Sequence, residues 1–191
     1  MKKNIKAFTL VEVVVSVTIF SIIMISIISI YILSSDTSLK SDINRAMHEN
    51  IKSVVTEISE DIIKNNILGV SIDTLDTCSF ATSTSYKHGS KLCTAGLNDY
   101  YLAKKTNSGY IRVDNLSCEP ITEQCFIVKN GKPLTNSLVT VKNLDFYVSS
   151  LFVNKATIKI ILQPTIKAGV KPNLIENNKL IFQTTISERP F

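Results

Sequence analysis

The sequence predicts an α+β protein in which a long N-terminal helix packs on a C-terminal antiparallel β-sheet. Three observations support this fold class. Residues 13–33 contain no charge, Pro or Gly. Apolar residues then recur at steps of three and four over residues 39–62, as on one face of a helix. Near the C-terminus, apolar and polar residues alternate at 156–163 and at 180–186, as in half-buried strands.

The uncharged run is long enough to cross a bilayer as a helix. Its 21 residues would span about 31 Å, and a hydrocarbon core is roughly 30 Å thick. Thirteen of the 21 are β-branched, which in a soluble protein favours a strand. In lipid, however, a lone strand leaves its amides unpaired, whereas a helix pairs them within the segment. We therefore predict a single membrane helix.

The basic residues are distributed as in a membrane protein with a cytoplasmic N-terminus. Lys2, Lys3 and Lys6 precede the apolar run and account for much of the net charge of +5. The rest of the chain is then expected outside the cytoplasm, where disulfides persist. Lysines 104, 105, 167, 171 and 179 could contact DNA phosphates, but few aromatic residues accompany the last three. Nucleic acid is therefore not an expected partner.

Two ordinary explanations of the apolar run leave one residue unexplained. A removable secretory signal has an apolar core of roughly 7–15 residues and a small-residue cleavage site. The present run is longer, and Leu33-Ser34-Ser35 matches such a site poorly. A plain single-pass anchor fits the hydropathy. Neither explanation accounts for Glu12, the only charged residue from 8 to 33.

Residues 6–12, Lys-Ala-Phe-Thr-Leu-Val-Glu, resemble the processing motif of type IV prepilins and of the pseudopilins of type II secretion. The resemblance implies that a prepilin peptidase cuts between Ala7 and Phe8 and that the new amine of Phe8 is methylated. It also implies that Glu12 pairs with the Phe8 ammonium of a neighbouring subunit, so that two charges costly in lipid neutralise one another. The sequence departs from the family at Ala7, where Gly is usual.

The resemblance implies a pilin-like division of the chain. Residues 1–7 would be the leader, 8–33 the membrane and filament-core helix, 34–66 an amphipathic helix, and 67–191 an extracytoplasmic β-sheet domain. The amphipathic stripe consists of Leu39, Ile43, Met47, Ile51, Val54, Ile58 and Ile62. Ser34-Ser35-Asp36 is the expected place for a break or kink. Gly69 is the first plausible helix stop.

The predicted sheet has at least four strands. Besides 156–163 and 180–186, residues 144–148 alternate, and residues 100–103 and 110–113 flank a turn at 106–109. Asn130-Gly131 is a second turn signal, after residues 126–128. Residues 67–98 look irregular, since they contain few periodic apolar positions.

Four cysteines allow three pairings. Their short spacings favour Cys118–Cys125 and Cys78–Cys93 as structural disulfides. A metal site is disfavoured because there is no C-x-x-C, and His48 and His88 lie far from any ligand spacing. Asp73 and Asp76 could join a calcium site but are more simply read as solvated. We predict no metal and no cofactor.

No catalytic or nucleotide-binding motif is present, so we predict a protein that is not an enzyme. Residues 139–148 and 183–187 resemble minor pseudopilins of the tip-associated J type. The resemblance implies a minor filament subunit of the inner membrane, with a prepilin peptidase/methyltransferase, other pilins and an inner-membrane assembly platform as partners. One alternative is a pilus-displayed receptor, an adhesin or a DNA-uptake pilin. Another is a single-pass envelope protein unconnected to pili.

Overall fold

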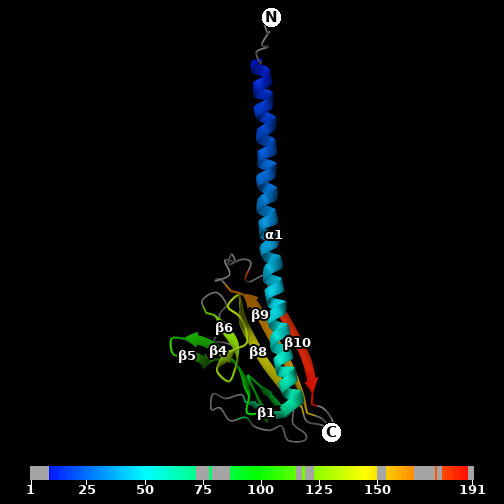
Figure 1. Cartoon of the computed structure of the whole chain (residues 1–191), viewed down its shortest axis with the longest axis vertical. Helices are drawn as coiled ribbons and strands as arrows, with labels where there is room; N and C mark the ends of the chain where they lie inside the picture. Colours follow the sequence, from blue (N-terminus) through cyan, green and yellow to red (C-terminus); the bar gives the residue numbers. More distant parts are fainter. Residues whose placement is uncertain are drawn as a thin grey trace, which may run out of the picture. The chain divides into compact units, whose positions relative to one another are not determined.

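The structure is a computed structural model that describes residues 9–71, 78, 87–114, 118, 123–149, 154–165, 175 and 178–188. It confirms the predicted α+β class, with one long helix and antiparallel sheets (Figure 1). The helix is α1 (Leu10–Asn65). The strands are β1 (Ile67–Ser71), β2 (Lys87–Gly89), β3 (Lys91–Thr94), β4 (Asp99–Thr106), β5 (Gly109–Arg112), β6 (Cys125–Lys129), β7 (Lys132–Pro133), β8 (Val139–Ser149), β9 (Lys155–Pro164) and β10 (Leu180–Ser187).

The chain divides into two compact units, Met1–Asp42 and Ile43–Phe191, and α1 contributes residues to both. The helix is continuous through Ser34-Ser35-Asp36, so the expected break at this point is wrong. Ser and Asp lower helix propensity by only tenths of a kcal/mol. In addition, the Thr37 hydroxyl donates to the Leu33 carbonyl at 2.8 Å, which satisfies it within the helix.

The helix ends at Asn65, earlier than the stop predicted at Gly69. Asn66 adopts the left-handed conformation (φ 60°), and its N–H donates to the Ile62 carbonyl at 3.0 Å. Asn is one of the few residues besides Gly that adopts this conformation readily and so caps a helix. Gly69 instead lies in β1, beside a bulge.

The predicted amphipathic stripe packs on the sheets within the second unit. Its buried members, each at most 6% exposed, are Ile43, Met47, Ile51, Val54, Ile58 and Ile62. Two polar residues, Asn50 and Asp61, share this buried face. The stripe therefore predicted the packing surface from Ile43 to Ile62, while Leu39 belongs to the other unit and is only half-buried. The stripe did not reveal the polar members of this surface.

The strands form two antiparallel sheets, where the sequence predicted one. The first sheet has the order β1-β3-β4-β6-β7, and β5 also pairs with β4. The second has the order β10-β9-β8-β2. In the second sheet the buried Leu144 and Ile160 and the half-buried Phe182 lie opposite one another on neighbouring strands. The predicted alternation of 156–163 and 180–186 is thus confirmed.

Residues 67–98 are not irregular throughout, because β1, β2 and β3 lie within them. All four residues of β3 are buried, including Lys91, whose ammonium lies 2.8 Å from the Asp99 carboxylate. A strand buried on both faces shows no alternation, so its pattern could not be recognised. The predicted hairpins, by contrast, are confirmed: β4 and β5 flank one turn, and Asn130-Gly131 joins β6 to β7 with φ values of 48° and 80°.

Candidate assembly site

The first turn of α1 is closed by a capping box formed by Thr9 and Glu12. The Glu12 carboxylate accepts from the Thr9 backbone N–H at 3.1 Å and from the Thr9 hydroxyl at 3.0 Å. In return, the Glu12 N–H donates to the Thr9 hydroxyl oxygen at 3.3 Å. This reciprocal pattern, Thr-x-x-Glu, satisfies backbone donors that a helix start otherwise leaves unpaired. It explains locally why the helix begins at Leu10.

Residues 10–33 of α1 are exposed and, apart from Glu12, uncharged, and their Ser and Thr hydroxyl groups are satisfied inside the helix. Each Ser and Thr hydroxyl in this range donates to the carbonyl four residues earlier, at 2.7–2.9 Å; the donors are Ser16, Thr18, Ser21, Ser26 and Ser29. Polar groups without a partner are costly in an apolar environment, so this arrangement suits lipid. Within the described residues, α1 is long and apolar enough to cross a membrane.

The predicted cleavage site, Ala7 and Phe8, lies outside the described residues. Glu12 lies in the first turn of α1, near the start of the predicted membrane helix. The cleavage, the methylation of Phe8 and its pairing with Glu12 therefore stay predictions. The capping role of Glu12 was not predicted, although the Thr-x-x-Glu spacing could have revealed it.

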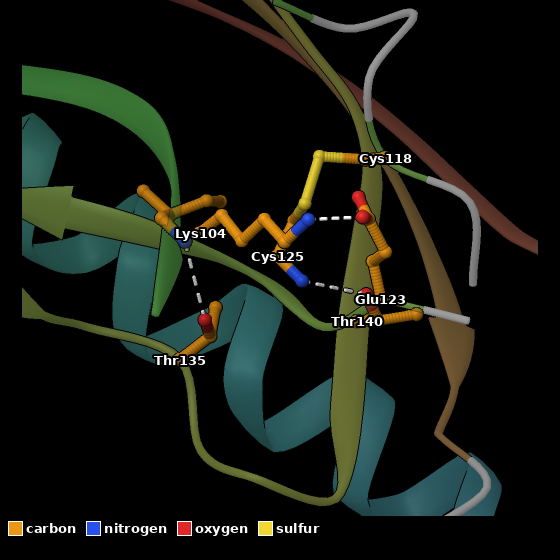
Figure 2. Close-up of a disulfide and its surroundings, with 7 residues drawn as sticks. Lys104, Cys118, Glu123, Cys125, Thr135 and Thr140 are labelled. Carbon is orange, nitrogen blue, oxygen red and sulfur yellow. Dashed lines mark hydrogen bonds and ion pairs between the residues drawn. A yellow bond between two sulfur atoms is a disulfide. The ribbon is translucent and has the colours of Figure 1, made fainter. Parts of the chain in front are cut away.

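Both cysteine pairings favoured by the spacing are present in the structure, Cys78–Cys93 and Cys118–Cys125. Figure 2 shows the second disulfide at the start of β6, where the Cys125 N–H donates to the Thr140 hydroxyl at 3.0 Å. Glu123, in the loop that this disulfide closes, forms an ion pair with Lys104 of β4. The disulfide therefore joins Cys118 to the start of β6, where Cys125 bonds to β8 and Glu123 pairs with β4.

Asp61 is the centre of a buried hydrogen-bond network. Its carboxylate accepts from the Thr94 and Tyr100 hydroxyls, both at 2.9 Å, and from the amides of Asn65 (2.6 Å) and Asn98 (2.9 Å). Burial opposes ionisation, but the hydrogen bonds from these four residues together hold the pKa of Asp61 below its ordinary value. Burial and the adjacent carboxylate raise the pKa of Tyr100. The sequence contained one signal of this network, because Asp61 is a polar residue three positions after Ile58, where the apolar stripe predicts a buried side chain.

The other candidate sites are only partly within the described residues. No group of three or more potential metal ligands occurs among the residues that the structure describes. Asp73 and Asp76, considered for calcium, lie outside them, as do Lys167 and Lys171, considered for DNA. The remaining lysines of that set are Lys104, which is ion-paired, and the exposed Lys105 and Lys179.

A long N-terminal helix packed against antiparallel sheets is an α+β layout typical of pilins. The family model described as "Prokaryotic N-terminal methylation motif" matches residues 2–28, so the chain carries the type IV prepilin-type signal. This confirms the family resemblance of the first residues. No curated protein and no solved structure shows significant similarity to the chain.

The motif supports a type IV pilin- or pseudopilin-like precursor. It implies processing by a prepilin peptidase and assembly with other pilins. Together with the apolar helix it suggests membrane anchoring. The motif marks a family of structural proteins that are generally not enzymes.

Proposed function

We propose that this protein is a minor pilin or pseudopilin, a structural subunit of a type IV pilus-like or type II secretion filament. One observation carries the proposal. The prepilin-type signal at residues 2–28 extends into an exposed apolar helix whose Ser and Thr hydroxyl groups need no outside partner. Such a helix can move from lipid into a bundle of similar helices without exposing unsatisfied polar groups.

In the proposed mechanism, Glu12 serves the helix first and the filament afterwards. In the single chain its carboxylate caps the first turn through Thr9. Removal of residues 1–7 creates an ammonium on Phe8, and methylation keeps that charge. During assembly the Phe8 ammonium of one subunit pairs with the Glu12 carboxylate of its neighbour. Partners in this mechanism are a prepilin peptidase/methyltransferase, an inner-membrane platform and other subunits.

We assign a different role to each of three consecutive segments of the chain. Residues 8–33 anchor the protein in the inner membrane and then form filament core, while residues 34–66 present the sheet domain of 67–191. The N-terminus lies in the cytoplasm and the sheet domain outside it. The two disulfides suit that oxidising location.

Glu12 substitutions test the charge pair separately from the cap. Glu12→Gln retains an acceptor for the Thr9 N–H but carries no charge, whereas Glu12→Ala loses both. We expect both variants to be cleaved normally, because the substitutions leave Ala7 and Phe8 unchanged, and both to be depleted from sheared filaments at least tenfold. Normal incorporation of Glu12→Gln would contradict the charge pair, and loss only in Glu12→Ala would assign the defect to the cap.

A second candidate function, a receptor displayed on the filament, is favoured by an open cleft of about 380 Å³. The cleft is lined by Lys104, Lys105, Thr106, Asn107, Glu123, Gln124 and Phe126. Gene deletion separates the two functions. Loss of filaments supports the structural subunit, while intact filaments that have lost attachment or uptake support the receptor. In the latter case Lys105→Ala should reproduce the attachment defect.

A further inference from the structure

Three polar side chains of α1 bond to the sheet side of the second unit at three levels along the helix. At the first level, the side-chain oxygen of Asn50 accepts from the Asn136 backbone N–H at 2.8 Å, while the side-chain NH₂ of Asn50 donates to the Ala46 carbonyl at 2.7 Å. At the second level, Glu57 lies 2.5 Å from the Lys129 ammonium of β6. These two contacts join helix positions to residues that are 86 and 72 positions away in the sequence.

The third level is Asp61, which bonds to β3, to β4 and to the turn between them. Its carboxylate accepts hydrogen bonds from the side chains of Thr94, Asn98 and Tyr100, each at 2.9 Å. The second and third levels are themselves linked, because the Lys129 ammonium lies 5.5 Å from the centre of the Tyr100 ring. From Asn50 to Asp61 the contacts extend over about 16 Å of helix.

The apolar stripe alone would define the axial position of the helix weakly. Val54, Ile58 and Ile62 are spaced by four residues and are all β-branched. A slip of one turn, about 5.4 Å, would place each of these side chains close to the site that its neighbour had filled. The carboxylates of Glu57 and Asp61 are also four residues apart, so such a slip would bring one towards the site of the other. Asn50 has no such counterpart, because the residues four positions away are Ala46 and Val54, and a slip of one turn would leave the Asn136 N–H without its acceptor.

We propose that Asn50, Glu57 and Asp61, with their partners on the sheets, form a polar lock that fixes the axial register of α1 and carries load along the helix. The proposal rests on the proposed function, in which a subunit is extracted and held by its N-terminal helix. Hydrogen bonds weaken steeply beyond their normal length, so contacts of 2.5–2.9 Å resist a small axial displacement. Apolar packing is not directional and resists the same displacement less sharply.

The test compares two variants of matched stability under axial force. Tyr100→Phe removes one donor from Asp61 and keeps the ring, whereas Ile58→Val removes one methylene from the stripe. Urea is adjusted until the full-length, disulfide-intact proteins in detergent micelles have equal unfolding free energies. Each chain is then pulled between its two ends by force spectroscopy. We expect Tyr100→Phe to rupture about tenfold faster than Ile58→Val at the same force.

Equal rupture rates for the two matched variants would overturn the lock, because load resistance would then follow overall stability alone. Asn98→Ala, which removes a half-buried donor, serves as the milder variant if Tyr100→Phe does not fold, with the same expected ordering. Glu49→Gln breaks only the exposed Arg45–Glu49 pair and should leave the rupture rate unchanged. Equal rupture rates in a protein whose N-terminus in cells is processed to Phe8 would overturn the lock alone. An N-terminus that is not processed in cells would overturn the proposed function.

Discussion

Replacing Asp61 with Ala should lower the equilibrium stability of the protein severely. Two of the four donors that the carboxylate satisfies, the Thr94 and Tyr100 hydroxyls, belong to residues with no exposed surface. A buried donor left without an acceptor costs about 1–3 kcal/mol. The amides of Asn65 and Asn98 belong to half-buried residues and can reach water, so they add less.

The two buried hydroxyls together set the expected loss at about 3–5 kcal/mol, a large part of the roughly 5–15 kcal/mol that stabilises a typical domain. The assay is urea unfolding of the full-length protein at a fixed detergent concentration, followed by tyrosine fluorescence, since the chain has six Tyr and no Trp. Asn98→Ala is the matched control and should cost about 1 kcal/mol. A loss below about 1 kcal/mol for Asp61→Ala would refute the reasoning, because the hydroxyls would then have found other partners.

Two further predictions concern acid and the disulfide. Because the pKa of Asp61 is lower in the folded than in the unfolded protein, its contribution should be complete above the unfolded value and disappear as pH falls through the folded one. Melting temperatures measured between pH 5 and pH 2 should therefore fall more for the native chain than for Asp61→Ala, and parallel curves would contradict the assignment. The Cys118→Ala/Cys125→Ala double variant should lose about 2.5 kcal/mol by the loop-closure entropy of so short a loop. Unfolding with and without reductant checks this value, and an unchanged midpoint would show that the disulfide does not stabilise the fold.

The parts of the fold that depend on local periodicity could be predicted from the sequence. The helix, its stripe from Ile43 to Ile62 and the strand pair β9–β10 each repeat with their own period. The strands β1, β2 and β3 could not, because β1 and β3 are mostly buried on both faces and β2 has only three residues, too few to show a period. The division into two sheets also depends on pairings between distant segments, which no local pattern contains.

The same distinction applies to the sites. The prepilin-type signal is continuous in the sequence, so residues 2–28 were recognisable without a structure. The Asp61 network joins residues up to 39 positions apart, and its donors are ordinary Thr, Asn and Tyr side chains. The Glu12 cap is also local, because Thr9 and Glu12 form a Thr-x-x-Glu spacing, but the prepilin resemblance explains Glu12 only by its pairing with another subunit. One carboxylate can serve both roles at different stages.

The mass of the N-terminal peptide of the protein purified from its own cells tests the central claim most directly. The account predicts a chain that begins at Phe8 and carries one methyl group on its α-amine. A chain that retains Met1, or one that begins beyond Leu33, would contradict it.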